Sequence, residues 1–136
     1  MTQPVFFSDV VTALRSMLLD DLPDWGYSGI PVVSMVPNPR PAMFVRLFRT
    51  GGPRLNMVAD DAQITVESWA NEDTDAHDLA QAVRGLIYAT RGTSTGGLSI
   101  YRVQEFAGPG WLPDSFSDQP RFTQTFSVAA RGVASI

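Results

Sequence analysis

The sequence has 136 residues, of which 44% are hydrophobic and 18% are charged, and its formal net charge is -4 at pH 7. These values are typical of a globular protein, so residues 1–136 are predicted to form a single domain with a buried core. The negative net charge argues against tight binding to a nucleic-acid backbone, which requires clustered positive charge.

Several residue types that carry chemistry are missing or rare. Cysteine is absent, which excludes disulfides, thiolate metal sites and cysteine nucleophiles. All ten basic residues are arginine, so there is no Schiff-base or phosphate-loop lysine. No apolar run approaches the ~20 residues that cross a bilayer. The N-terminal sequence lacks the basic and apolar regions of a secretory signal, so we expect a soluble protein made in the cytoplasm.

The first helix is predicted from Asp9 to Asp21. Ser8 is a suitable N-cap, and Pro23 and Gly26 end the helix. Apolar residues recur at helical spacing and predict one buried stripe, formed by Val10, Val11, Leu14, Met17 and Leu18.

The following stretch, residues 27–42, carries four prolines between positions 31 and 41. This spacing excludes a central strand and leaves an extended edge segment or an ordered loop.

Two strands are predicted next. In "MFVRLFRTGG" the side chains alternate, with Met43, Val45 and Leu47 on one face and Phe44, Arg46 and Phe48 on the other. Because both faces carry large apolar groups, we expect one face to be covered and the other to contact something else. The second strand is clearest from Ala62 to Ala70. One face carries Ala62, Ile64 and Val66, and the other carries Gln63, Thr65, Glu67 and Trp69. Residues 53–61 either extend this hairpin or form a protruding loop.

The second helix is predicted from Asp75 to Thr90, capped by Thr74 or Asp73. Its buried stripe is predicted to comprise Ala76, Leu79, Ala80, Val83, Leu86 and Ile87. Gly85 inside this helix costs about 1 kcal/mol relative to alanine and indicates close packing at that point.

Two further strands, "GGLSIYRVQEFAG" and "RFTQTFSVAAR", are predicted after the second helix. The order α-β-β-α-β-β predicts an α+β domain, an antiparallel or mixed sheet of about four strands flanked by two helices.

The sequence offers little support for catalysis. His77, the only histidine, falls on the polar side of the second helix, where a solvated side chain is the ordinary outcome. The acidic pairs at 18–21, 59–61 and 72–75 lack the spacing of a calcium loop. "GTSTGG" at 92–97 has no phosphate-binding lysine and is interpreted as a connector. These residues therefore predict no catalytic residue, cofactor or metal site.

The segment "GPGWLPDSFSDQPRF", residues 108–122, is too long for an ordinary hairpin turn. Its prolines and aromatic residues argue against disorder, and ordered loops of this length are often functional. Two interpretations remain open. Trp111 plugs the edge of the core, or the loop is a recognition surface whose prolines lower the ordering cost of binding.

The order of these pieces resembles the tail terminator proteins of long-tailed bacteriophages, also described as tail-completion or tail-to-head joining proteins. The resemblance covers roughly residues 43–131 and the N-terminal helix. It is carried by "GGP" after the first strand, "ITVESWA", the helix "AHDLAQAVRGL" and "GPGWLPD…PRF" before the last strand. The resemblance implies a non-enzymatic, ring-forming structural virion protein. Residues 27–42 match no feature of the family.

The resemblance implies that the chain assembles with itself, as a hexamer, on the last ring of the tail tube. Its partners would be the tail tube protein and a neck or head-completion protein, with genomic DNA passing through the lumen without specific binding and no membrane involved. It would be assembled in the host cytoplasm and located at the tail–neck junction of the virion. The candidate interface residues are Phe44, Arg46, Phe48, Arg49, Arg54, Trp69, Trp111, Phe116 and Arg121.

Two other interpretations remain. The chain could be a neck or head-completion connector between portal and tail, or a small ligand-binding or enzymatic domain that uses its acidic loops. The last of these predicts a concave pocket with converging polar groups.

Overall fold

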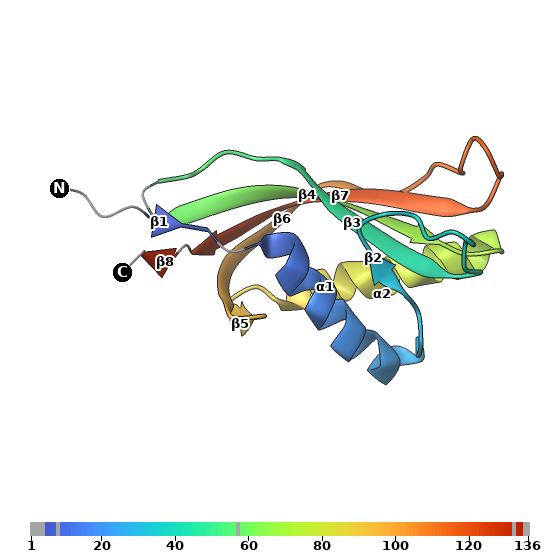
Figure 1. Ribbon diagram of the computed structural model, residues 1–136, viewed down its shortest axis with the longest axis horizontal. Coiled ribbons are helices and arrows are strands. Elements are labelled where there is room, and N and C mark those ends of the chain that lie inside the picture. The colour runs from blue at the N-terminus through green and yellow to red at the C-terminus, as the bar shows by residue number, and fades with distance from the viewer. Residues whose placement is uncertain (1–4, 8, 57, 132, 135–136) are drawn as a thin grey trace.

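The computed structural model describes residues 5–7, 9–56, 58–131 and 133–134. Its elements are arranged as two helices on one side of a large sheet, with a separate short ribbon at one end (Figure 1). Along the chain they are β1 (Val5–Phe6), α1 (Val10–Asp21), the 3-10 helix η1 (Leu22–Trp25), β2 (Val32–Val33), β3 (Phe44–Gly51), β4 (Ala59–Trp69), α2 (Asp73–Ala89), β5 (Thr93–Thr95), β6 (Leu98–Trp111), β7 (Arg121–Arg131) and β8 (Val133–Ala134).

The large sheet that these described residues form is six-stranded, in the order β2-β3-β4-β7-β6-β5. β2 runs parallel to β3, whereas the other neighbours are antiparallel, so the sheet is mixed. β1 and β8 pair with each other in a separate two-stranded ribbon. No helix among the described residues is both long enough and apolar enough to span a membrane.

The predicted fold class is wrong in its strand number and element order. A sheet of about four strands in the order α-β-β-α-β-β was expected, but the sheet has six strands and forms a half-barrel. The strands that were missed are short: β2 has two residues within the proline-rich stretch, and β5 has three within "GTSTGG". Segments of this length contain no measurable alternation, and neighbouring backbone rather than local pattern makes them strands.

The sheet curls around α1, and both of its edges reach that helix. At one edge, Arg15 of α1 donates from Nε to the carbonyl oxygen of Val32 in β2, 2.6 Å away. At the other edge, the turn after β5 approaches α1 so closely that a Cβ on Gly96 would lie 2.8 Å from the Cα of Ala13. Gly96 also has a φ of +56°, so glycine is required there for conformation and for space.

The core fills the concave side of the curled sheet. Apolar residues of the strands alternate inward and meet the buried stripes of both helices, as predicted for Val45, Leu47, Ile64 and Val66. Gln124 of β7 also points into this core and is fully buried. Its Nε2 donates to the carbonyl oxygen of Ala80 in α2 at 3.1 Å, which ties the helix to the middle of the sheet.

Both helices lie close to their predicted positions. The carboxylate of Asp9 caps α1, with Oδ1 accepting from the backbone nitrogens of Val11 at 2.9 Å and Thr12 at 3.3 Å. Ser8, the predicted cap, lies outside the described residues. α2 begins at Asp73, two residues earlier than predicted, and Glu72 occupies the N-cap position without a side-chain hydrogen bond.

Gly85 of α2 departs from the prediction of close packing. It is exposed, and a Cβ built on it would meet nothing within 4 Å. Leu86, predicted to be buried, is half-buried beside it. The helix therefore leaves an open space at this glycine.

Two uncertain segments become clear in the sheet. β4 begins at Ala59, and a bridge between Arg54 and Asp60 continues the ladder, so residues 53–61 largely extend the hairpin. Likewise β6 continues to Trp111, which pairs with Phe122. The connection between β6 and β7 is thus residues 112–120, shorter than the segment expected from sequence. It projects from the end of the sheet opposite to β1 and β8 (Figure 1).

Candidate interaction surface

A stacked aromatic pair lies on the convex face of the sheet, at the end from which the 112–120 loop projects. Phe44 of β3 and Trp69 of β4 are direct cross-strand partners, with ring centroids 5.0 Å apart and an interplanar angle of 20°. Both rings are buried although no helix covers this face. Loop residues and arginine side chains provide the cover instead.

Two guanidinium groups lie against the indole of Trp69. The Cζ of Arg121 is 5.0 Å from the ring centroid, and that of Arg40 is 5.5 Å from it. Distances below about 6 Å allow cation–π attraction, and the flat guanidinium also shields the ring from water. The two arginines come from different segments, so the indole is the point at which β4, β7 and the loop before β3 meet.

Glu67 provides the negative charge for this cluster. Its Oε1 accepts from Arg46 Nη1 at 3.2 Å and from Trp69 Nε1 at 3.3 Å, and Oε2 lies 3.7 Å from Arg121 Nη1. The residue is 7% exposed. A carboxylate this deeply buried is stable when it is paired and hydrogen-bonded, and here two arginines and an indole N–H satisfy it.

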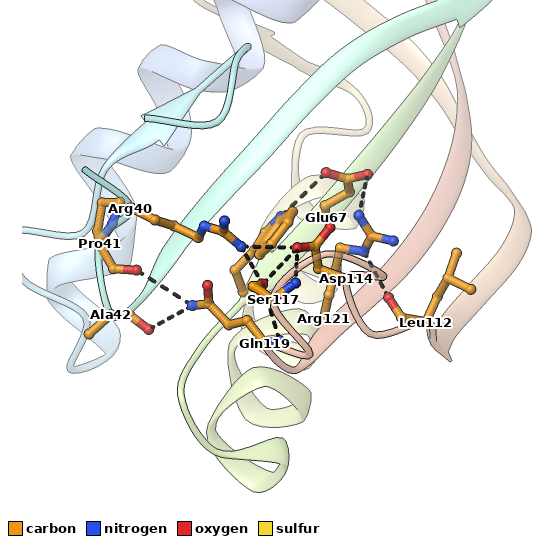
Figure 2. A network of polar contacts seen from close by, with 10 residues as sticks. Arg40, Pro41, Ala42, Glu67, Leu112, Asp114, Ser117, Gln119 and Arg121 are labelled. Atoms are coloured by element: carbon orange, nitrogen blue, oxygen red, sulfur yellow. Dashed lines mark hydrogen bonds and ion pairs between the residues drawn. The ribbon is translucent and has the colours of Figure 1, made fainter. Parts of the chain in front are cut away.

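The 112–120 loop is fixed to the loop before β3 (Figure 2). Asp114 Oδ2 accepts from Arg40 Nη1 at 3.0 Å, and Gln119 Nε2 donates to the carbonyl oxygens of Pro41 and Ala42 at 3.5 and 3.4 Å. At the base of the loop, Arg121 Nε donates to the carbonyl oxygen of Leu112 at 2.8 Å. Both ends of the connection are therefore anchored.

The loop also carries an internal turn centred on Asp114. Its carboxylate accepts from the backbone nitrogen of Ser117 at 3.0 Å and from the Ser117 hydroxyl at 2.6 Å. The serine hydroxyl, followed by Arg40, lowers the pKa of the Asp114 carboxyl because these donors favour its charged form. Asp118 then adopts a φ of +55°, which Asp tolerates better than most residues.

This scaffold presents apolar side chains to solvent. Phe116 at the loop tip is 95% exposed, and Leu112 is exposed at its base. An ordered loop loses little conformational freedom on binding, and an exposed aromatic side chain is typical of interface hot spots. The 112–120 loop and the aromatic–arginine cluster beneath it therefore make up a preorganised projection suited to contact with another protein.

The nine candidate interface residues are divided between two ends of the sheet. Phe44 and Trp69 are buried, and Arg46 and Arg121 contact Glu67, so these four support the projection from within the subunit. Phe48 is half-buried, with the guanidinium of Arg46 4.2 Å from its ring. At the opposite end, Arg49 pairs with Asp60 at 2.7 Å, and Arg54 lies 4.8 Å from the ring of Phe7.

Trp111 and Phe116 are the exposed aromatic residues among the candidates. Trp111 is 51% exposed and packs edge-on against Phe122, with centroids 5.5 Å apart. Phe122 contacts His77 of α2 in turn, so Trp111 faces the helix side of the sheet rather than the convex side. Trp111 thus packs partly against the sheet edge, as the plug interpretation predicted, and the recognition role of the loop stays a prediction.

A groove lies between η1 and α2, and none of the sequence predictions included it. It has a volume of about 470 Å³ and is lined by Trp25, Tyr27, Gln81, Ala82, Gly85, Leu86 and Ala89. Trp25 is 69% exposed there. The available signal was a glycine on the outer face of an otherwise alanine-rich helix, together with a tryptophan just after the first helix.

The described residues show no metal-binding cluster, and their only histidine contacts its own helix. No group of three histidine or carboxylate side chains among them lies close enough to hold a metal ion. His77 is exposed and lies 3.4 Å from Asp78 and 3.4 Å from Gln81, both on its own helix.

No protein-family model matches the chain, and no curated protein is detectably similar to it.

Proposed function

We propose that this chain is a structural virion subunit that forms a ring on the end of a phage tail tube, ends tube growth and joins the tail to the neck of the head. The observation that carries the proposal is the anchored 112–120 loop with Phe116 at its tip. This loop, with the strand ends that hold it, coincides with "GPGWLPD…PRF", the piece of the family resemblance that precedes the last strand.

The arrangement of the projection supports a role in docking rather than in catalysis. Arg40, Asp114 and Gln119 hold the loop in place, and the polar side chains of the loop are used in these structural contacts. A subunit that docks repeatedly onto a fixed neighbour benefits from a surface that is already ordered before contact. The proposed partners are further copies of the chain, the tail tube protein and a neck protein.

A Phe116→Ala variant tests the docking role. The side chain makes almost no contact within the subunit, so the variant is expected to fold with unchanged stability. Tail tubes assembled with the native chain are expected to end in a ring-shaped cap by electron microscopy, and the Phe116→Ala chain is expected to leave most ends uncapped. Ser115→Ala, at the neighbouring exposed position, is the matched control and should cap normally.

Two outcomes would contradict the proposal. Normal capping by the Phe116→Ala chain would show that the projection is not the docking surface. If the native chain fails to bind tube ends and antibody label instead appears on the portal side of purified particles, the chain is a neck or head-completion connector.

A further inference from the structure

Most of the charged side chains that make no ion pair among the described residues lie in two regions, and Asp9, Arg15 and Asp118 lie outside both. Several carboxylates around the end of α1, η1 and the start of α2 make no ion pair within the part of the chain that the structure describes: Asp20, Asp21, Asp24, Glu72, Asp73 and Asp75. The helix dipole favours those at the start of α2, but it disfavours Asp20 and Asp21 at the C-terminal end of α1. Helix stability alone therefore does not explain this acidic region.

The apolar groove between η1 and α2 adjoins the acidic region on the side of Trp25 and Tyr27. Asp24 directly precedes Trp25, which forms one side of the groove. Burial, and then the nearby carboxylates of Asp78 and Asp75, raise the pKa of the Tyr27 phenol, which also lines the groove. Gly85 leaves the groove open, because nothing occupies the space where its Cβ would stand. The result is an apolar hollow with an acidic rim.

The opposite charge gathers at the other end of α2. Arg91 follows the helix, and Arg131 ends β7; both are exposed and make no ion pair with the described residues. They lie near one another because Gly92 donates its N–H to the carbonyl oxygen of Ile100 and Ile100 pairs with Ala130. We call this region the arginine end.

Exposed apolar groups accompany these arginines. Tyr101 is the additional residue of a bulge in β6, and it is 45% exposed. Val58, also exposed, lines the same hollow as Tyr101, Ser99 and Arg131. A bulge redirects a side chain away from the regular strand, so Tyr101 stands out at the sheet edge. The arginine end thus combines exposed apolar side chains with basic ones, and its charge is opposite to that of the carboxylates beside the groove.

We infer that the groove of one subunit receives the arginine end of the next subunit, with Tyr101 over Gly85 and with Arg91 and Arg131 facing the acidic rim. This inference rests on the proposed ring and identifies its subunit contact. The two surfaces differ: the groove runs along η1 and the C-terminal half of α2, whereas the arginine end lies beyond that helix, on Arg91, β6 and β7. A contact between unlike surfaces is heterologous, so it produces a closed ring or a filament rather than a two-fold dimer.

Disulfide trapping tests this contact directly, because the native chain has no cysteine. Ala82→Cys places a thiol on the groove wall, and Ser99→Cys places one at the arginine end. An oxidised mixture of the two full-length variants is expected to give covalent dimers, whereas each variant alone is expected to stay monomeric on a non-reducing gel. Ser115→Cys, on the distant 112–120 loop, is the control and should cross-link with neither.

Two further variants separate the groove from a general loss of folding. Gly85→Leu, made in the Ala82→Cys chain, is expected to fill the groove and abolish cross-linking to Ser99→Cys, with an unchanged circular dichroism spectrum. Gly85→Ala in the same chain adds one methyl group and should retain most cross-linking. Asp24→Arg should lower the yield about fivefold, the effect of one exposed ion pair, and pairing it with Arg131→Asp in the other chain should restore it.

Cross-linking of Ala82→Cys to itself, no cross-linking in the mixture, or full cross-linking with Gly85→Leu would each overturn the inference. The mass of the native protein in solution, together with the tube-capping assay, then decides the proposed function separately. Rings or capped tubes without the groove cross-link would leave the tail-end role standing with a different subunit contact. Absence of rings, caps and cross-links together would remove both.

Discussion

The guanidinium of Arg40 lies 3.0 Å from the carboxylate of Asp114, although 74 positions separate the two residues in the chain. This ion pair joins the loop before β3 to the loop after β6. It also places Arg40 against Trp69, so a single side chain covers the buried indole and anchors the exposed loop. The order of the projection and the burial of the convex aromatic pair therefore depend on each other.

Replacing Arg40 with alanine is expected to loosen the 112–120 loop more than it destabilises the domain. The side chains of the pair are 32% and 13% exposed, so we expect the free energy of unfolding to fall by only about 1 kcal/mol. Hydrogen exchange of the loop amides should rise strongly, whereas exchange in β4 and β7 should change little. Arg91→Ala, which removes an unpaired exposed arginine, is the control. Equal exchange in the two variants would show that Arg40 does not hold the loop.

The order of the loop is expected to depend on pH at the acid end of the scale. The pKa of Asp114 is lowered from its usual value of 3.8, chiefly by the Ser117 hydroxyl and also by Arg40. A group whose pKa is lowered in the ordered state stabilises that state above the ordinary pKa, and the effect is lost as the pH falls through the lowered value. Pepsin cleavage within residues 112–120 should therefore accelerate only below about pH 4. The Asp114→Asn variant should show fast cleavage throughout, and a native loop whose susceptibility rises well above that pH would contradict this assignment.

Glu67→Gln is expected to destabilise the whole domain. The change removes the buried charge that faces Arg46 and Arg121 and leaves two guanidinium groups in a crowded site without a counter-ion. Because both arginines keep some contact with water, we expect a loss of about 2 kcal/mol, below the range for a fully buried pair. Urea unfolding measures it. The control is Asp118→Asn, an equal charge change at an exposed position whose positive φ suits asparagine. A loss no larger than that of the control would mean that Glu67 is not the centre of the cluster.

The alternation of apolar residues predicted which side chains share a strand face, but not which face packs against the helices or what covers the other face. Val45 and Leu47 lie in the core as their spacing indicates, because period-two alternation directly reflects the geometry of a strand. Phe44 and Trp69 were correctly placed on the opposite face and predicted to contact a partner. They are buried instead, since loops distant in sequence cover them, and local pattern carries no information about such contacts.

The strand order and the groove could not be predicted from the sequence either, because both depend on contacts between segments that are distant in the chain. β2 becomes a strand because Val32 lies beside Val45 in parallel register, and nothing within its two residues encodes that neighbour. Gly85 was noticed, but an interior helical glycine is compatible with close packing and with open space. The structure shows that the space at Gly85 is open, with Trp25 on the other side of the groove.

Gly85→Ala is expected to stabilise the isolated subunit. The position lies inside α2, its φ is not in the positive range, and a Cβ would meet no atom within 4 Å. Removing the flexibility of glycine in the unfolded chain should then raise the free energy of unfolding by about 1 kcal/mol. Urea unfolding at low protein concentration, where copies do not associate, measures this. Gly92→Ala is the matched control, because its φ of +77° makes alanine unfavourable there, and it should lower stability by about 1 kcal/mol. A loss of stability in Gly85→Ala would show that another part of the subunit closes over this glycine in solution, and the groove would then not be available to a neighbouring copy.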